Sequence, residues 1–190
     1  NINVGDVIEV IFKIDAEELI YSMHFTTLPT IMIFTDEVIV DEPKILSRLI
    51  INDLLMNKTY DSHAGIEIRG GTSQNYPKVS YELELWENDS GSDIIDKELF
   101  GLRNDDDWQL DAMYIDLSKS RNILGMETWA SFARAPYLFE EEVRLSQRGN
   151  LVEVFLNNDY LGVYSFNEPI DRKQLDLNQN GGILYKAEER

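Results

Sequence analysis

The segment 65–86, GIEIRGGTSQNYPKVSYELELW, contains residue types that could bind an anion. Gly70 and Gly71 directly follow Arg69, and Lys78 comes after a short polar stretch. Backbone N–H groups in a glycine-containing turn can point together at an anion, Arg adds a bidentate donor, and Lys adds a point charge. Neither a Walker pattern nor a Gly-x-Gly-x-x-Gly pattern is present, so by local chemistry alone an ordinary charged connection is the simpler interpretation.

Two polar runs contain groups that metal ions prefer. Asp105–Asp107 offers three carboxylates, but adjacent residues seldom converge on one ion, and a polar loop before a strand explains them as well. Asp176, Asn178 and Asn180 match the start of an EF-hand calcium loop, yet Ala187 stands where the bidentate Glu belongs. A turn is therefore the better interpretation of this second run, with calcium as a weak alternative.

A third polar cluster, Glu168, Asp171 and Arg172, follows a predicted hairpin. Carboxylates near the end of a sheet can position a ligand, but they can equally form surface ion pairs that contribute little stability. The sequence around the cluster shows no nucleophile elbow and no nearby histidine that could act as a base.

The composition is that of a globular protein with a strongly acidic surface. The 190 residues are 43% hydrophobic, which is enough for one domain with its own core. A formal net charge of −18 repels nucleic-acid phosphates and argues against DNA or RNA as a partner. The chain has no cysteine and only two histidines, so disulfides and thiolate zinc sites are excluded and a histidine-rich metal site is improbable. No apolar run is long enough for a membrane-spanning helix.

The elements that must position these groups are mostly short strands. Alternating apolar residues predict strands at 7–13, 31–34, 66–69 and 80–86, and a hairpin at 151–166 that turns at Asn157-Asn158-Asp159. One amphipathic helix is predicted from Ser118 to Arg134, capped by Asp116 or Ser118. We therefore expect an α+β domain, in which the helix packs on a mostly antiparallel sheet.

Four stretches in order resemble the CotH family, the spore-coat-protein-H-like atypical protein kinases. They are GIEIRGGTSQNYPKVSYELEL, LFGLRNDDDWQLDAMYIDLSKSRNIL, VEVFLNNDYLGVYSFNEPIDRKQLDL and GGILYKAEE, and the resemblance covers about residues 28–190. Residues 1–27 would then be an N-terminal extension of strands. The resemblance favours a strand for Ile45 to Asn52, and implies a kinase-like fold in which the sheet and one helix form an N-lobe over ATP.

The resemblance also implies a function and a set of site residues. It implies transfer of the γ-phosphoryl group of ATP to a protein hydroxyl, with Mg²⁺ or Mn²⁺. Lys78 matches the family's phosphate-binding lysine, with Arg69 in the same hairpin. Arg121 and Asn122 match an Arg-Asn motif near the cleft, and Glu168 falls near a kinase-like hinge. Val79 stands where family members carry a second basic residue.

The resemblance ends before the family's acidic catalytic motifs would begin, since the sequence stops at Arg190. We therefore expect a truncated domain portion with no kinase activity of its own, because phosphoryl transfer needs those carboxylates. The alternative is a non-catalytic secreted or cell-envelope module that retains the fold for binding or structure. We also expect an extracytoplasmic setting, such as a spore coat or bacterial cell surface, and a homodimer through a face exposed by truncation.

Overall fold

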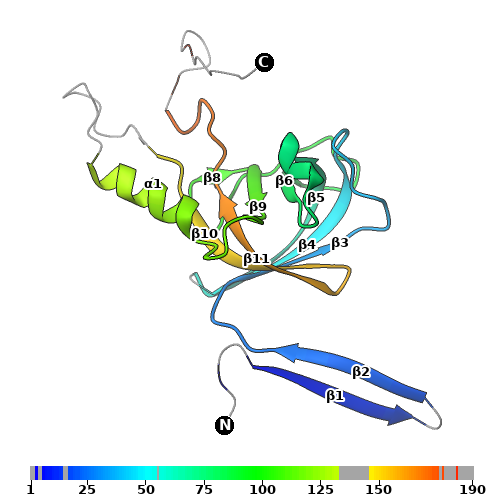
Figure 1. Ribbon diagram of the computed structural model, residues 1–190. Coiled ribbons are helices and arrows are strands. Elements are labelled where there is room, and N and C mark those ends of the chain that lie inside the picture. The colour runs from blue at the N-terminus through cyan, green and yellow to red at the C-terminus, as the bar shows by residue number, and fades with distance from the viewer. Residues whose placement is uncertain are drawn as a thin grey trace.

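The computed structural model describes residues 3, 6–14, 17–54, 56–132, 146–175, 177 and 183. Strands dominate this part of the chain, which contains a single α-helix (Figure 1). The elements in order are β1 (Val7–Ile14), β2 (Glu17–His24), β3 (Thr30–Phe34), β4 (Ile45–Asp53), β5 (Lys58–Arg69), a 3-10 turn (Thr72–Asn75), β6 (Ser80–Trp86), β7 (Lys97–Glu98), β8 (Asn104–Asp105), β9 (Asp107–Asp111), α1 (Arg121–Phe132), β10 (Gly149–Leu156) and β11 (Asp159–Asn167).

Seven strands form a closed barrel in the order β10-β11-β9-β6-β5-β4-β3. All neighbours are antiparallel except β3 and β10, whose parallel pairing closes the barrel. Inward-pointing side chains fill the interior and leave it inaccessible to solvent. The most buried of these are Ile31, Ile33, Leu49, Ile51, Ala64, Ile66, Leu83, Leu85, Trp108, Leu110, Val152, Val154, Tyr164 and Phe166.

Several strand predictions are confirmed. The strand at 80–86 has the predicted alternation, with Tyr81, Leu83 and Leu85 buried and the residues between them half-buried. The hairpin β10–β11 turns where expected, and Asn157 and Asn158 adopt left-handed φ values of 49° and 73°. Asparagine tolerates this backbone region better than most residues, which explains the turn. Ile45 to Asn52 is also a strand, within β4.

The prediction of an α+β domain resembling a kinase N-lobe is wrong. The described chain is mostly strand, the sheet closes on itself, and α1 has no buried residue. Only Ile123 and Met126 of α1 are half-buried, and the apolar residue Trp129, three residues after Met126, is 61% exposed. The physical reason is the β3–β10 pairing, which joins strands far apart in sequence and encloses the core without a covering helix.

The helix α1 begins three residues later than predicted, although its predicted capping residue is correct. The Asp116 carboxylate accepts hydrogen bonds from the backbone N–H groups of Ser118, Ser120 and Arg121. Together with the Ser118 hydroxyl and the Arg121 charge, these bonds lower the pKa of Asp116 to about 2. Asp116 therefore stays ionised and satisfies N–H groups that the helix itself leaves without partners.

The strands β1 and β2 pair only with each other and form a two-stranded sheet of their own. This hairpin projects away from the barrel, to which it is joined through residues 25–29 (Figure 1).

Candidate functional site

Lys78 lies at one end of the barrel, in the connection between β5 and β6, and its ammonium group is half-buried. The Nζ atom donates a hydrogen bond of 2.5 Å to the carbonyl oxygen of Val163 and lies 3.9 Å from the centre of the Tyr164 ring. The Tyr164 hydroxyl in turn donates to the Val79 carbonyl, which ties this connection to β11. The carbonyl and the ring face hold the ammonium in place but supply no negative countercharge.

A second lysine, Lys119, lies close to Lys78 at the same end of the barrel. Its Nζ donates to the carbonyl oxygens of Met113 and Tyr114, at 2.6 and 3.2 Å, in the connection between β9 and α1. Tyr114 stacks on Tyr76, so this connection packs against the one that carries Lys78. Burial, followed by repulsion from Lys119, lowers the pKa of Lys78 to about 8. The two ammonium groups repel each other, and in the described part of the chain neither is paired with a carboxylate, which makes this end of the barrel favourable for an anion.

Arg69, at the same end of the barrel, forms ion pairs with neighbouring acidic residues. Its Nη1 donates to Asp111 Oδ1 at 2.7 Å, and its Nε lies 3.8 Å from Glu82 Oε2. The other Asp111 oxygen, Oδ2, accepts a hydrogen bond from the side-chain amide nitrogen of Asn167. The side-chain oxygen of Asn167, Oδ1, accepts a hydrogen bond from the Ser165 hydroxyl. This polar network covers the outer face of β9 and β11. Because Arg69 already has carboxylate partners, it is less available to an anion than Lys78.

Glu168 lies toward the other end of β9, away from Lys78. Its carboxylate is fully buried and accepts bonds from the backbone N–H of Arg103 and from Arg148 Nη2, at 2.8 and 2.7 Å. Glu168 lies there because it directly follows β11, whose last residue, Asn167, pairs with Gln109 near the middle of β9. Glu168 therefore joins an internal ion network and does not meet Lys78.

The same internal network contains part of the acidic run. Arg103 donates to Asp105 and, in a bidentate pair, to Asp171, while Lys173 donates to both Asp105 and Asp106. Burial opposes ionisation of Lys173 and Asp106, but several hydrogen bonds and opposite charges together outweigh it. The pKa of Lys173 is therefore raised by Asp105 and Asp106, and the pKa of Asp106 is lowered mainly by Lys173. Asp105 and Asp106 are therefore buried and paired with cationic side chains, and do not lie in an exposed polar loop.

Two acidic groups among the described residues have oxygens close enough to share a cation, namely Glu84, Asp106 and Asp107, and Asp96, Asp105 and Asp106. Lys173 already occupies the second group, and Lys44 lies 3.7 Å from Glu84 in the first. Both groups lie near the start of β9, about 13 Å along the strand from its Lys78 end at ~3.3 Å per residue. They do not fit a metal ion bridging phosphates held by Lys78.

Asp107 provides a test of this acidic environment. Burial, followed by repulsion from Asp106, raises the pKa of Asp107 to about 6. A raised carboxyl pKa means that ionisation destabilises the fold, with the full cost above pH 6 and none below pH 4. We expect Asp107→Asn to increase the free energy of unfolding by about 1 to 2 kcal/mol at pH 7.5, after a discount for solvent screening. Urea unfolding of wild type and variant should give converging values as the pH approaches 4.

The control for this prediction is Asp89→Asn, at an exposed loop position. It should change the unfolding free energy by less than ~0.5 kcal/mol at both pH values. A stabilisation by Asp107→Asn that is the same at pH 4 and pH 7.5 would contradict the assigned cause, because it would not depend on ionisation.

The remaining predicted residues belong to the start of α1 and to the C-terminal run proposed as a calcium loop. Arg121 and Asn122 begin α1 with exposed side chains, and the Arg121 Nε atom lies 3.5 Å from Asp116. The calcium-loop candidates Asp176, Asn178 and Asn180 lie outside the described residues. Lys119 was missed, although it stands two residues before Arg121, because no local pattern distinguished it from a surface lysine.

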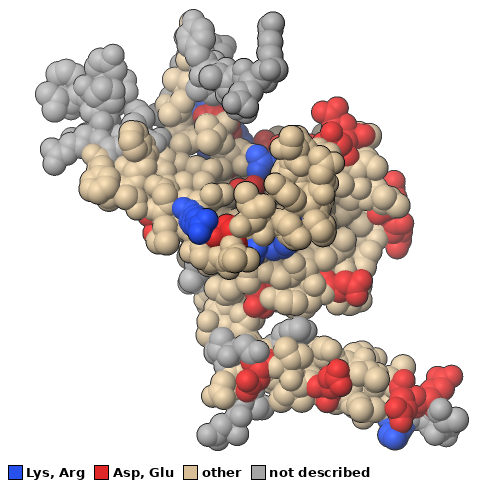
Figure 2. Space-filling view, in the orientation of Figure 1, with Lys and Arg blue, Asp and Glu red and all other residues tan. Residues whose placement is uncertain are grey.

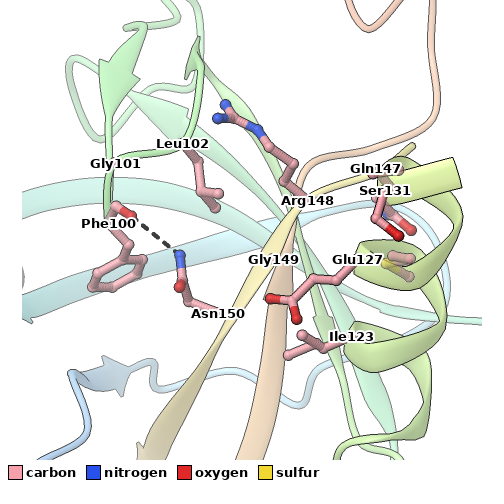
Figure 3. Close-up of a pocket in the computed structure, with 12 residues that line it drawn as sticks. Phe100, Gly101, Leu102, Ile123, Glu127, Ser131, Gln147, Arg148, Gly149 and Asn150 are labelled. Carbon is pink, nitrogen blue, oxygen red and sulfur yellow. Dashed lines mark hydrogen bonds between the residues drawn. The ribbon is translucent and has the colours of Figure 1, made fainter. Parts of the chain in front are cut away.

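A pocket of about 480 Å³ separates α1 from the barrel (Figure 3). Ile123, Glu127 and Ser131 of the helix face Leu102 and the strand segment 148–150 across it. The floor is fixed by Asn150, whose amide donates to the Phe100 carbonyl at 3.1 Å. Lys78 does not line this pocket. It is a second hollow, mainly apolar, of a size that suits a small ligand or a large side chain.

The basic groups on the face in Figure 2 form small separate patches over the barrel and the start of α1, whereas acidic groups gather at one edge and along the β1–β2 hairpin. Such a surface does not suit an extended polyanion. No helix among the described residues is long and apolar enough to cross a membrane.

The fold and the site together define a closed β-barrel domain with a small cationic site at one end. The family model described as CotH kinase protein matches residues 66–190, which include the Lys78 connection, β9, α1 and the β10–β11 hairpin. The chain therefore belongs to the CotH kinase protein family. Comparison with curated proteins gave no matching sequence.

Proposed function

We propose that the chain binds the phosphates of ATP between Lys78 and Lys119, within a kinase that phosphorylates a protein hydroxyl. The observation that carries the proposal is the half-buried Lys78, whose ammonium lies on the Tyr164 ring, is repelled by Lys119 and has no carboxylate partner among the described residues. A phosphate group there would remove the repulsion between the two lysines and accept charge-assisted hydrogen bonds from them. The family match supports the choice of ATP with a divalent metal ion.

Isothermal titration calorimetry with ATP and Mg²⁺ tests this site through Lys78→Ala. Loss of one charge-assisted hydrogen bond should weaken binding by about 10- to 100-fold. Lys97→Ala is the matched control, because Lys97 also lies over a tyrosine ring, that of Tyr60, but at a distance of 5.8 Å and away from this end of the barrel. Lys97→Ala should bind like wild type. Equal heats for Lys78→Ala and wild type would remove Lys78 from the site.

The pH dependence of the same titration gives an independent check. Because the pKa of Lys78 is about 8, wild-type affinity should fall as the pH rises from 7 to 9. A lysine with its ordinary pKa of ~10.4 would keep its charge over this interval. The Lys78→Ala variant should show a flatter profile. A wild-type affinity that is constant from pH 7 to 9 would exclude the low-pKa lysine as the main phosphate ligand.

A second candidate function is binding without catalysis, and the pocket between α1 and the barrel favours it. Its apolar walls, including Leu102, Ile123 and Met126, suit an apolar group of a ligand or partner. This function predicts that wild type gives no heat with ATP and Mg²⁺ at any pH, whereas the phosphate site predicts saturable binding.

A further inference from the structure

The β1–β2 hairpin has two chemically different faces. Its register places Phe12 opposite Leu19 and Val10 opposite Tyr21, so these four side chains share one face. Phe12 and Tyr21 pack edge to face, with ring centroids 5.7 Å apart. The apolar face carries Ile8, Val10, Phe12, Leu19, Tyr21 and Met23, with Glu17 at the end of the face where β2 begins. The opposite, mixed face consists of Val7, Glu9, Ile11, Lys13, Glu18, Ile20 and Ser22.

The mixed face is suited to water, and the apolar face is not. On the mixed face Lys13 and Glu18 form an ion pair at 2.6 Å, and Glu9 stands opposite Ser22. On the apolar face Phe12, Leu19, Tyr21 and Met23 remain 42–55% exposed, and the charged residue Glu17 lies beyond them, at the first position of β2. Neither strand pairs with the barrel, so nothing among the described residues covers this face.

A two-stranded hairpin is marginally stable in water unless a third strand or a packed face supports it. Covering the apolar face would provide that support. We propose that the apolar face packs against the same face of a second copy, which forms a four-stranded sandwich and a symmetric dimer. Two such sheets would pack ~10 Å apart, with side chains interdigitated.

Charge and geometry favour a second copy as the occupant. Two chains of net charge −18 repel each other over most of their surfaces, but contact through the apolar faces places no acidic pair at its centre. The hairpin projects from the barrel, so two hairpins can pack while the acidic barrels stay apart (Figures 1 and 2). The exposed side-chain fractions correspond to roughly 1,000 Å² buried in total, which is at the lower limit for a specific dimer and predicts micromolar or weaker association.

Sedimentation velocity over a concentration series tests the proposal. Wild type should shift from monomer to dimer as its concentration approaches about 100 µM. Tyr21→Lys, on the apolar face, should remain monomeric, because it would bury a charge at the contact. Ile20→Lys is the matched control, since Ile20 is the neighbouring residue with similar exposure (60% against 55%) on the mixed face, and it should dimerise like wild type. Thermal unfolding should confirm that the barrel is intact in both variants.

The absence of native cysteine permits a second, direct measurement. Tyr21→Cys should form a disulfide-linked dimer under mild oxidation, whereas Ile20→Cys should do so much more slowly. A wild type that stays monomeric at all concentrations would overturn the proposal, as would a dimer that both lysine variants leave intact. A monomer that floats with anionic phospholipid vesicles, and loses that binding in Tyr21→Lys, would assign the apolar face to lipid and also overturn it. None of these measurements involves ATP, so they test the dimer independently of the proposed phosphate site.

Discussion

Replacing Arg103 with methionine is expected to lower the free energy of unfolding by about 3 to 5 kcal/mol. The Arg103 guanidinium is 8% exposed and pairs with Asp105, which is fully buried, and with Asp171. Methionine fills part of the volume but cannot compensate these charges. Lys173 would still neutralise part of the cluster, yet Asp105 would lose the hydrogen bond to its Oδ2 atom. Urea denaturation at pH 7.5 measures the loss.

Arg48→Met is the matched control, because Arg48 also pairs with a carboxylate, that of Asp61, in a bidentate arrangement at 2.8 and 2.5 Å. Both side chains are 55% exposed, so water and salt screen the pair. We expect a much smaller loss than for Arg103→Met. Similar losses for Arg48→Met and Arg103→Met would show that burial does not determine the strength of the Arg103 network.

A double variant separates lost attraction from uncompensated charge. Adding Asp105→Asn to Arg103→Met removes one of the buried charges that the single variant leaves without its arginine. The double variant should therefore be more stable than Arg103→Met alone by about 1 kcal/mol or more. If the two substitutions are simply additive, the cost of Arg103→Met arises from packing and not from charge.

Gly149→Ala is expected to destabilise the barrel by about 2 to 4 kcal/mol. A methyl group at this position would overlap the Asn167 side-chain oxygen and lie 2.8 Å from the carbonyl oxygen of Phe166. The backbone carbonyl cannot move without disturbing the β10–β11 pairing, in which Gly149 stands opposite Asn167. Moving the Asn167 amide would also weaken its bond to Asp111, the partner of Arg69. Thermal or urea unfolding should show the loss directly.

Gly125→Ala, in the middle of α1, is the contrasting control. A methyl group there would meet no atom within 4 Å, and alanine is the better helix former. This substitution should leave the fold unchanged or stabilise it by up to ~1 kcal/mol. If Gly149→Ala proves equally harmless, the close approach of β10 and β11 at this position is looser than the structure indicates.

Local patterns in the sequence correctly predicted several individual elements. The alternation in Ser80–Trp86 predicted both the strand and its buried face, because side chains on a strand point to opposite sides in turn. Asn157 and Asn158 predicted the turn between β10 and β11 through their tolerance of left-handed backbone angles. Asp116, one of the two residues predicted to cap α1, does accept hydrogen bonds at its start. Each prediction depended on residues close together in the chain.

Such local patterns could not predict that the sheet closes into a barrel, or which residues of the candidate site lie close together. The parallel pairing of β3 with β10 joins segments more than a hundred residues apart, and no local periodicity specifies it. The helix was assigned a packing role from its apolar spacing, yet the closed sheet already encloses the core and leaves α1 with no buried residue. The predicted fold class failed for that reason.

At the candidate site, the residue types alone establish which positions carry charge, including Lys78, Arg69 and Glu168. The partners of these charges follow from the fold. Strand register turned Arg69 toward Asp111 and placed the buried Glu168 beside Arg148, and the fold brought Lys119 close enough to Lys78 to repel it. The physical reason is that the electrostatics of a charged group depend on its burial and on its neighbours across the barrel, which strand pairing sets and local sequence does not.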